Sequence, residues 1–136
     1  MLTELQTISE LQELPAIRAY LQTRLAGMHH PQLTTAIIDA VLLASVEAVT
    51  NIIKHAYADA TDRALRVCLS LQDDLLCITL LHHGDRAMPE QIGEPDFSGM
   101  REDGFGLFII HELMDTVTYG REAPDWQCIT MTKSLL

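Results

Sequence analysis

Two polar side chains lie inside the most apolar part of the chain. Glu47 and Asn51 are four residues apart, in a stretch made mostly of Ala, Val, Leu and Ile. On a helix this spacing places both on one side. The Asn51 carbonyl oxygen could bind Mg²⁺, which prefers oxygen ligands, while Glu47 accepts a proton from a nucleophile or water. In a competing structural interpretation, which the spacing alone favours, both are solvated or hydrogen-bonded to a neighbouring sheet.

A second candidate site is the segment from Asp103 to Leu107, which reads Asp-Gly-Phe-Gly-Leu. Its two glycines open a helix that the sequence predicts over residues 106–114. Glycine lets a backbone approach a ligand closely, and a helix N-terminus offers free N–H groups at the positive end of its dipole. The segment could therefore hold phosphates, although an ordinary turn from loop to helix explains the same pattern.

A third segment, His82-His83-Gly84, follows a predicted strand. Paired histidines suggest a metal site. Adjacent residues on a strand point to opposite faces, however, so they rarely bind one ion together. We do not expect a metal site formed by this pair.

The elements that must position these residues follow from hydrophobic periodicity and turn residues. A first helix is predicted over residues 8–25, with Ser9 as its cap, or starting at Pro15, which suits a first turn. A long apolar helix is predicted next over residues 31–57, followed by two strands at 64–71 and 75–81. A long irregular segment at 84–104 leads to a short helix at 106–114, and a hairpin of strands 115–121 and 126–133 closes the chain. Such segregated runs predict an α+β fold, an antiparallel or mixed sheet with helices on one face.

Composition narrows the class of protein. The chain has 136 residues, 48% of them hydrophobic, which predicts one domain with a real core. The net charge of -10 argues against a nucleic-acid surface and against an anionic membrane surface, but it suits a basic protein partner. The opening segment does not resemble a signal peptide, the apolar runs are broken well before 18 residues, and three cysteines in apolar runs suggest reduced thiols. We therefore expect a cytoplasmic protein without a membrane span.

Two motifs together resemble a known family. The stretch from Glu47 to Tyr57, Glu-x-x-x-Asn followed by His-Ala-Tyr, looks like the N box of the GHKL (histidine kinase-like) ATPase superfamily, in the form of its anti-sigma-factor serine/threonine kinase branch. The stretch from Gly104 to Asp115, with Tyr119, looks like the second glycine box of that superfamily and the strand after it. The resemblance covers roughly residues 10–134, nearly the whole chain.

The resemblance implies a single domain over residues 1–136, with the two-layer α/β sandwich of the Bergerat fold and a mixed, mostly antiparallel sheet. It implies that ATP is bound, that Asn51 binds the Mg²⁺ bridging the phosphates, and that Glu47 is the catalytic base. The nucleotide lid would be about residues 88–103. The remaining nucleotide-binding residues would be His82, Gly84, Gly104, Phe105, Gly106 and Leu107.

The resemblance also implies partners. Proteins of this branch bind a sigma factor or another effector, and they phosphorylate a serine or threonine on a STAS-domain anti-anti-sigma factor, which switches the partner that they hold. A homodimer is expected as well. No direct contact with nucleic acid or a membrane is expected.

One residue departs from the pattern of this family. Its first glycine box has the form Asp-x-Gly, in which the Asp accepts a hydrogen bond from the adenine amine, and His82 stands in its place. A neutral histidine can accept through one ring nitrogen, whereas a protonated one cannot. If His82 contacts the adenine amine, ATP affinity should therefore fall as the pH drops from about 8 to 6. Loss of the acceptor would weaken binding roughly 5- to 150-fold. The alternative function is a non-catalytic module that holds a partner with weak or lost ATP binding.

Overall fold

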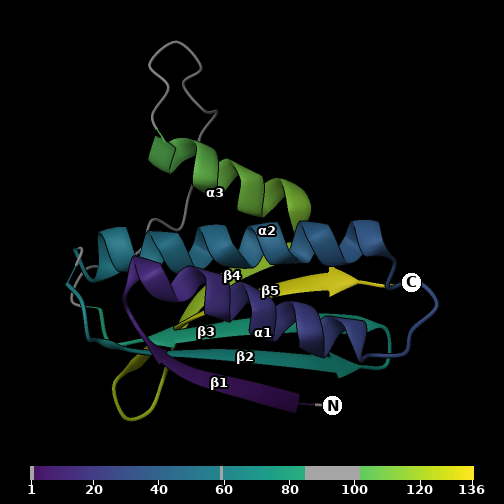
Figure 1. Ribbon diagram of the computed structural model, residues 1–136, viewed down its shortest axis with the longest axis horizontal. Coiled ribbons are helices and arrows are strands. Elements are labelled where there is room, and N and C mark those ends of the chain that lie inside the picture. Colours follow the sequence, from purple (N-terminus) through teal and green to yellow (C-terminus); the bar gives the residue numbers. More distant parts are fainter. Residues whose placement is uncertain (1, 59, 85–101) are drawn as a thin grey trace.

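The computed structural model describes residues 2–58, 60–84 and 102–136. For Leu2 and residues 102–107 it describes the backbone but not the burial of the side chains. Its five strands form one sheet in the order β1-β2-β3-β5-β4 (Figure 1). Every neighbouring pair is antiparallel, so the sheet is antiparallel throughout rather than mixed. The strands are β1 Leu2–Ile8, β2 Ala64–Gln72, β3 Leu75–His82, β4 Thr116–Glu122 and β5 Trp126–Ser134.

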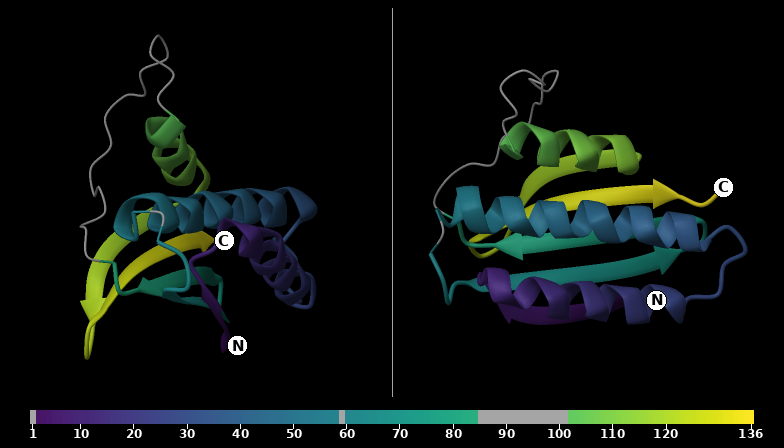
Figure 2. Two further views of the ribbon diagram at one scale, coloured as in Figure 1. Left: turned by 60° about the vertical axis from the view of Figure 1, so that its left-hand side comes forward. Right: turned by 45° about the horizontal axis from the view of Figure 1, so that its top comes forward.

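The helices cover one face of this sheet, which gives the predicted two-layer α+β architecture (Figure 2). Helix α2 lies between the other two and contacts both. The core forms where the apolar faces of the helices meet the inner face of the sheet, with side chains such as Leu21, Leu42 and Leu80 fully buried. The helical elements are η1 Leu11–Glu13, α1 Leu14–Ala26, α2 Thr35–Asn51, the π-helical turn η2 Ile52–Ala56 and α3 Glu102–Leu113.

The N-terminal segment corrects two expectations. Strand β1 was not predicted, because it becomes a strand only through its pairing with β2, which lies far along the chain. The predicted cap of the first helix was also wrong. Helix α1 begins at Leu14 with Pro15 in its first turn, and the Ser9 hydroxyl instead donates to the Ala60 carbonyl oxygen at 2.7 Å.

The central helix is shorter than the predicted 31–57. Thr34 caps α2 by accepting a hydrogen bond from the Ile37 N–H at 3.3 Å, and the last turn before Tyr57 is π-helical. The expectation that no apolar segment is long enough for a membrane span was wrong, because Thr35–Ala56 has 22 residues and a mean hydropathy of 1.9. Half of its apolar window is buried inside the fold, which is the position of a core helix.

Tyr57 fastens the end of the central helix to the sheet. Its hydroxyl donates to the Ala64 carbonyl oxygen at 2.5 Å and accepts from the His83 N–H at 2.7 Å. Ala64 begins β2, and His83 directly follows β3, so one phenol oxygen bridges two neighbouring strands where their ladder ends. The tyrosine is 7% exposed, and its removal would leave both backbone groups without this partner.

The Tyr57→Phe variant should lower the free energy of unfolding by about 1–3 kcal/mol, because two backbone groups, the Ala64 carbonyl and the His83 N–H, lose their partner. Tyr20→Phe is the matched control, since within the described residues the Tyr20 hydroxyl is hydrogen-bonded to one side chain, that of Thr3, and to no backbone group. We expect the control to lose about 0.5–1.5 kcal/mol. Denaturant unfolding of both variants measures the difference. Equal losses of unfolding free energy would show that the Tyr57 bridge stabilises the fold no more than an ordinary side-chain hydrogen bond.

Candidate functional site

The end of α2 carries the candidate catalytic pair. Glu47 lies one turn before Asn51, which is the last residue of α2, and both therefore lie on the same side of the helix. Glu47 is half-buried, whereas Asn51 is 4% exposed. The sequence placed both residues on the central helix, and the structure agrees.

The Asn51 side chain is incompletely satisfied. Its Nδ2 is buried and has no hydrogen-bond partner within the described part of the chain. A buried amide in this state costs about 1–3 kcal/mol. A polar group of this kind, next to a π-helical turn, is a common feature of ligand sites. The residue present therefore fits a bound polar ligand or a hydrated metal ion.

His82 occupies the inner side of the end of β3. It is 1% exposed, and its ring lies edge-on to that of Tyr57, with 5.9 Å between ring centroids. The Gly84 N–H donates to His82 Nδ1 at 3.0 Å. Burial, assisted by the nearby charge of His83, lowers the pKa of His82 to about 4. The ring is therefore neutral at pH 7, with Nδ1 as acceptor and the proton on Nε2.

This geometry overturns the pH dependence expected for His82. A ring with a pKa near 4 does not gain a proton between about pH 8 and 6. The Nδ1 lone pair is already used by Gly84, and a protonated Nε2 is a donor only. His82 therefore cannot accept a hydrogen bond from an adenine amine in the way that the carboxylate of the family pattern does.

Gly84 lies directly against the end of the central helix. A Cβ atom built there would lie 2.5 Å from Ala56 Cβ and 2.8 Å from the Ala56 carbonyl oxygen. Gln127 holds the same residue from β5 by donating its side-chain amide N–H to the Gly84 carbonyl oxygen. The structure thus brings His82 and Gly84 to the helix end that carries Asn51.

The neighbouring His83 belongs to different surroundings. Its ring stacks on Trp126 with 3.6 Å between centroids, and its Nδ1 lies 3.4 Å from an Asp125 carboxylate oxygen. Trp126 also lies under the Arg66 guanidinium, 5.1 Å from its ring centroid. The two histidine rings therefore contact different partners, as the alternation of a strand requires.

The glycine box is only partly described. Helix α3 starts at Glu102, so Gly104, Phe105, Gly106 and Leu107 lie within its first two turns, and the predicted start at residue 106 was too late. Their surroundings lie outside the described residues, as does most of the predicted lid at 88–103. Their contact with phosphates remains a prediction.

Two residues of the site had no role in the sequence-based analysis. Tyr57 bridges the strands beside His82, and Ala56 is small enough for Gly84 to approach. Both belong to the His-Ala-Tyr part of the first motif, which is the signal that could have identified them. The roles of Ala56 and of the Tyr57 hydroxyl can be recognised only when the strand ends that they contact are known.

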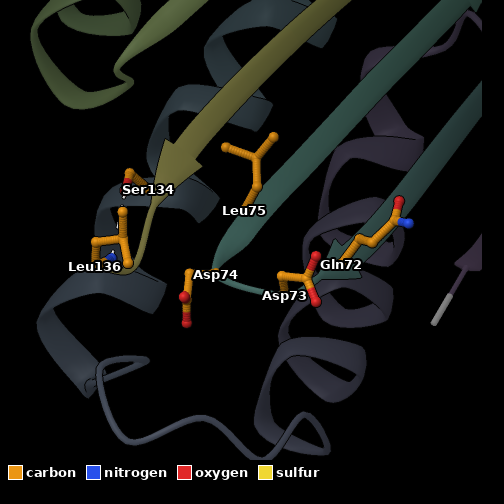
Figure 3. Close-up of a pocket in the computed structure, with 6 residues that line it drawn as sticks. All are labelled: Gln72, Asp73, Asp74, Leu75, Ser134 and Leu136. Atoms are coloured by element: carbon orange, nitrogen blue, oxygen red, sulfur yellow. Dashed lines mark hydrogen bonds between the residues drawn. The ribbon is translucent and has the colours of Figure 1, made fainter.

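A hollow at the other end of β3 is not part of this site. It has a volume of about 420 Å³ and lies around the turn between β2 and β3 (Figure 3). His82 ends the same strand that Leu75 begins, so the hollow and the candidate site are separated by the length of β3. Its lining residues are Gln72, Asp73, Asp74, Leu75, Ser134 and Leu136.

Gly84→Ala should lower the free energy of unfolding by about 1–3 kcal/mol, because the added methyl group overlaps the Ala56 backbone. Gly120→Ala is the matched control, since its nearest neighbour would be Cys128 Sγ at an ordinary 3.6 Å. The control should change stability by less than about 1 kcal/mol. Thermal or denaturant unfolding measures both, and a harmless Gly84→Ala would contradict the close contact.

Acid should destabilise the wild type through His82. The pKa of the folded state lies below that of the unfolded chain, at about 4 against 6.5, so the unfolded state binds the extra proton between these values. Stability is then fully present above about pH 6.5 and falls as pH drops toward 4, by up to about 1.4 kcal/mol per pH unit. His82→Asn removes this proton uptake, and unfolding at several pH values should show a shallower slope. Equal slopes would refute the neutral, buried ring.

Comparison of the sequence with known proteins identifies a family. Residues 8–133 match the histidine kinase-like ATPase domain. Serine-protein kinase RsbW of Staphylococcus epidermidis is 33% identical over 90 residues, which cover 60% of this chain and 57% of that protein. Serine-protein kinase RsbW of Staphylococcus aureus (strain MRSA252) is 33% identical over 105 residues, which cover 71% of this chain and 65% of that protein.

The chain thus spans less than two thirds of the length of these relatives. The family match, in contrast, runs from the end of β1 almost to the end of β5 and includes every candidate site residue. The two-layer fold agrees with it. This chain belongs to the histidine kinase-like ATPase family.

Proposed function

We propose that this protein is an ATP-dependent serine/threonine protein kinase of the anti-sigma-factor type. It binds Mg-ATP and phosphorylates a hydroxyl on a STAS-domain anti-anti-sigma partner, which switches its hold on a sigma factor or another effector. The observation that carries the proposal is the buried amide of Asn51, one turn after Glu47 on the central helix, whose nitrogen has no hydrogen-bond partner among the described residues. The names of the RsbW relatives support the kinase class.

Each residue of the pair has one task. Asn51 presents its amide from a buried, fixed position, which suits it to hold Mg²⁺. Glu47 is half-buried beside it and accepts the proton of the partner hydroxyl. When bound, Mg-ATP supplies the transferable phosphoryl group and neutralises its charge. The glycine box from Gly104 to Leu107 is proposed to lie against the phosphates.

The proposed partners, location and oligomeric state follow from the family and from the charge of the chain. The net charge of -10 favours basic protein partners over nucleic acid or anionic membranes. The protein is proposed to act in the cytoplasm, with residues 88–103 as the nucleotide lid. A homodimer is part of the proposal.

A second function is favoured by one specific observation. His82 Nδ1 accepts from the Gly84 N–H, so the ring offers a donor where the family pattern has an acceptor for the adenine amine. ATP affinity would then be weak or lost. In that case the domain acts as a non-catalytic module that holds its partner without phosphoryl transfer.

Calorimetric titration with ATP, with and without Mg²⁺, separates the two functions. Binding below millimolar ATP that depends on Mg²⁺ supports the kinase, and no binding at millimolar ATP supports the module. In a transfer assay with a STAS-domain partner, Glu47→Gln should lower the rate by about 10²–10⁴ and leave ATP affinity within a few-fold.

Asp39→Asn is the matched control, because Asp39 is an exposed carboxylate on the same helix. It should leave both affinity and transfer unchanged. Transfer unaffected by Glu47→Gln would assign Glu47 a structural role.

A further inference from the structure

His82 presents one hydrogen-bond donor at the end of β3. The Gly84 N–H donates to its Nδ1 at 3.0 Å, and because a backbone N–H can only donate, the neutral ring carries its proton on Nε2. No described residue accepts a hydrogen bond from this Nε2–H. Among the described residues, Asn51 Nδ2 is the only side-chain nitrogen or oxygen that is both sealed from solvent and unpartnered. The Nε2–H of His82 is therefore open to a ligand or to solvent.

The surroundings of the ring fix this donor in place. Turning the ring over would remove the acceptor of the Gly84 N–H, and Gly84 is itself buried. Gly84 cannot follow the ring, because it lies against Ala56 on one side and is held by Gln127 from β5. The Tyr57 ring lies edge-on to His82, which is 1% exposed. The site thus offers a preorganised donor and no acceptor at this position.

A donor at residue 82 suits a different base from the one that the family pattern binds. In that pattern the carboxylate of Asp-x-Gly accepts from the adenine amine, and His82 stands in place of the Asp. Two N–H donors, the amine and the His82 Nε2–H, cannot bond to each other. Guanine and hypoxanthine carry a carbonyl oxygen where adenine has its amine, and this oxygen is the acceptor that the Nε2–H lacks.

We propose that the nucleotide site of this protein selects a purine with a carbonyl oxygen in place of the adenine amine, so that GTP binds more tightly than ATP, with His82 Nε2 donating to that oxygen. The inference rests on the nucleotide site of the proposed function and concerns the base alone. GTP and ATP have the same phosphates and bind Mg²⁺ in the same way, so Asn51 and Glu47 keep their proposed tasks with either nucleotide.

The selection comes from pairing or failing to pair one hydrogen bond in a site with little water. A bound ATP would bring its amine against the Nε2–H and leave the two donors facing each other. A bound GTP would pair the same donor. A made bond against a missing one corresponds to about 5- to 150-fold in the dissociation constant. ATP is then a weaker ligand of the same site rather than an excluded one.

Calorimetric titration of the full chain with Mg²⁺ and GTP, ITP or ATP tests the preference without a transfer assay. ITP is the decisive probe, because it shares the carbonyl with GTP but lacks the second amine of guanine. GTP and ITP should each bind about 5- to 150-fold more tightly than ATP. Tight GTP with weak ITP would assign the preference to the second amine and overturn the role of His82.

Two further outcomes separate this inference from the proposed function. ATP bound as tightly as GTP and ITP, or more tightly, would overturn the inference and leave the kinase standing. If none of the three nucleotides binds at millimolar concentration, both the inference and the kinase are wrong, and the non-catalytic module remains.

Variants at residue 82 test whether that side chain makes the choice. His82→Asp restores an acceptor, so ATP should become the tightest of the three ligands, because a carboxylate faces the carbonyl of GTP and ITP unfavourably. His83→Asn is the matched control, since the His83 ring contacts Trp126 and Asp125 instead. The control should keep the order of the wild type. An unchanged order in His82→Asp would show that the base does not meet this residue.

His82→Asn serves if His82→Asp fails to fold, which circular dichroism detects. The amide of asparagine can either donate or accept, depending on how it turns. His82→Asn should therefore bring the dissociation constants of ATP and GTP within a few-fold of each other. A preference for GTP that persists undiminished in this variant would contradict the proposed hydrogen bond.

Discussion

The contact between the end of the central helix and the end of β3 organises the candidate site. Gly84 lies so close to Ala56 that no side chain fits between them, and the Tyr57 hydroxyl bridges the adjoining strands. Both contacts come from the end of the π-helical turn that follows Asn51, at Ala56 and Tyr57, so they fasten the end of the helix to the end of the sheet.

The chemistry of His82 follows from that constraint. A ring confined beside Tyr57 and Gly84 loses its water, and burial makes the charged form unfavourable. The neutral ring then uses its lone pair within the chain. A carboxylate at the same place has further lone pairs to offer a ligand. The substitution therefore changes an acceptor into a donor.

The apolar composition of the central helix is explained by its position in the fold. The helix is long and apolar enough to span a membrane, yet it packs on the sheet between the two other helices, where an apolar surface on several sides is expected. The polar pair Glu47 and Asn51 lies in the last two turns of this helix. Asn51 is buried, and its amide nitrogen has no hydrogen-bond partner within the part of the chain that the structure describes.

The sequence by itself determined the α+β class, the central helix, both hairpins, and the positions of Glu47 and Asn51, because periodicity and turn residues are local signals. It did not reveal β1, since an edge strand with mixed polarity is defined by the pairing of distant segments. The sequence showed that His82 departs from the family's Asp-x-Gly pattern, but it did not reveal the protonation state of the ring. Only the tertiary structure decided that, because desolvation and the Gly84 hydrogen bond arise when the strand end meets the helix end.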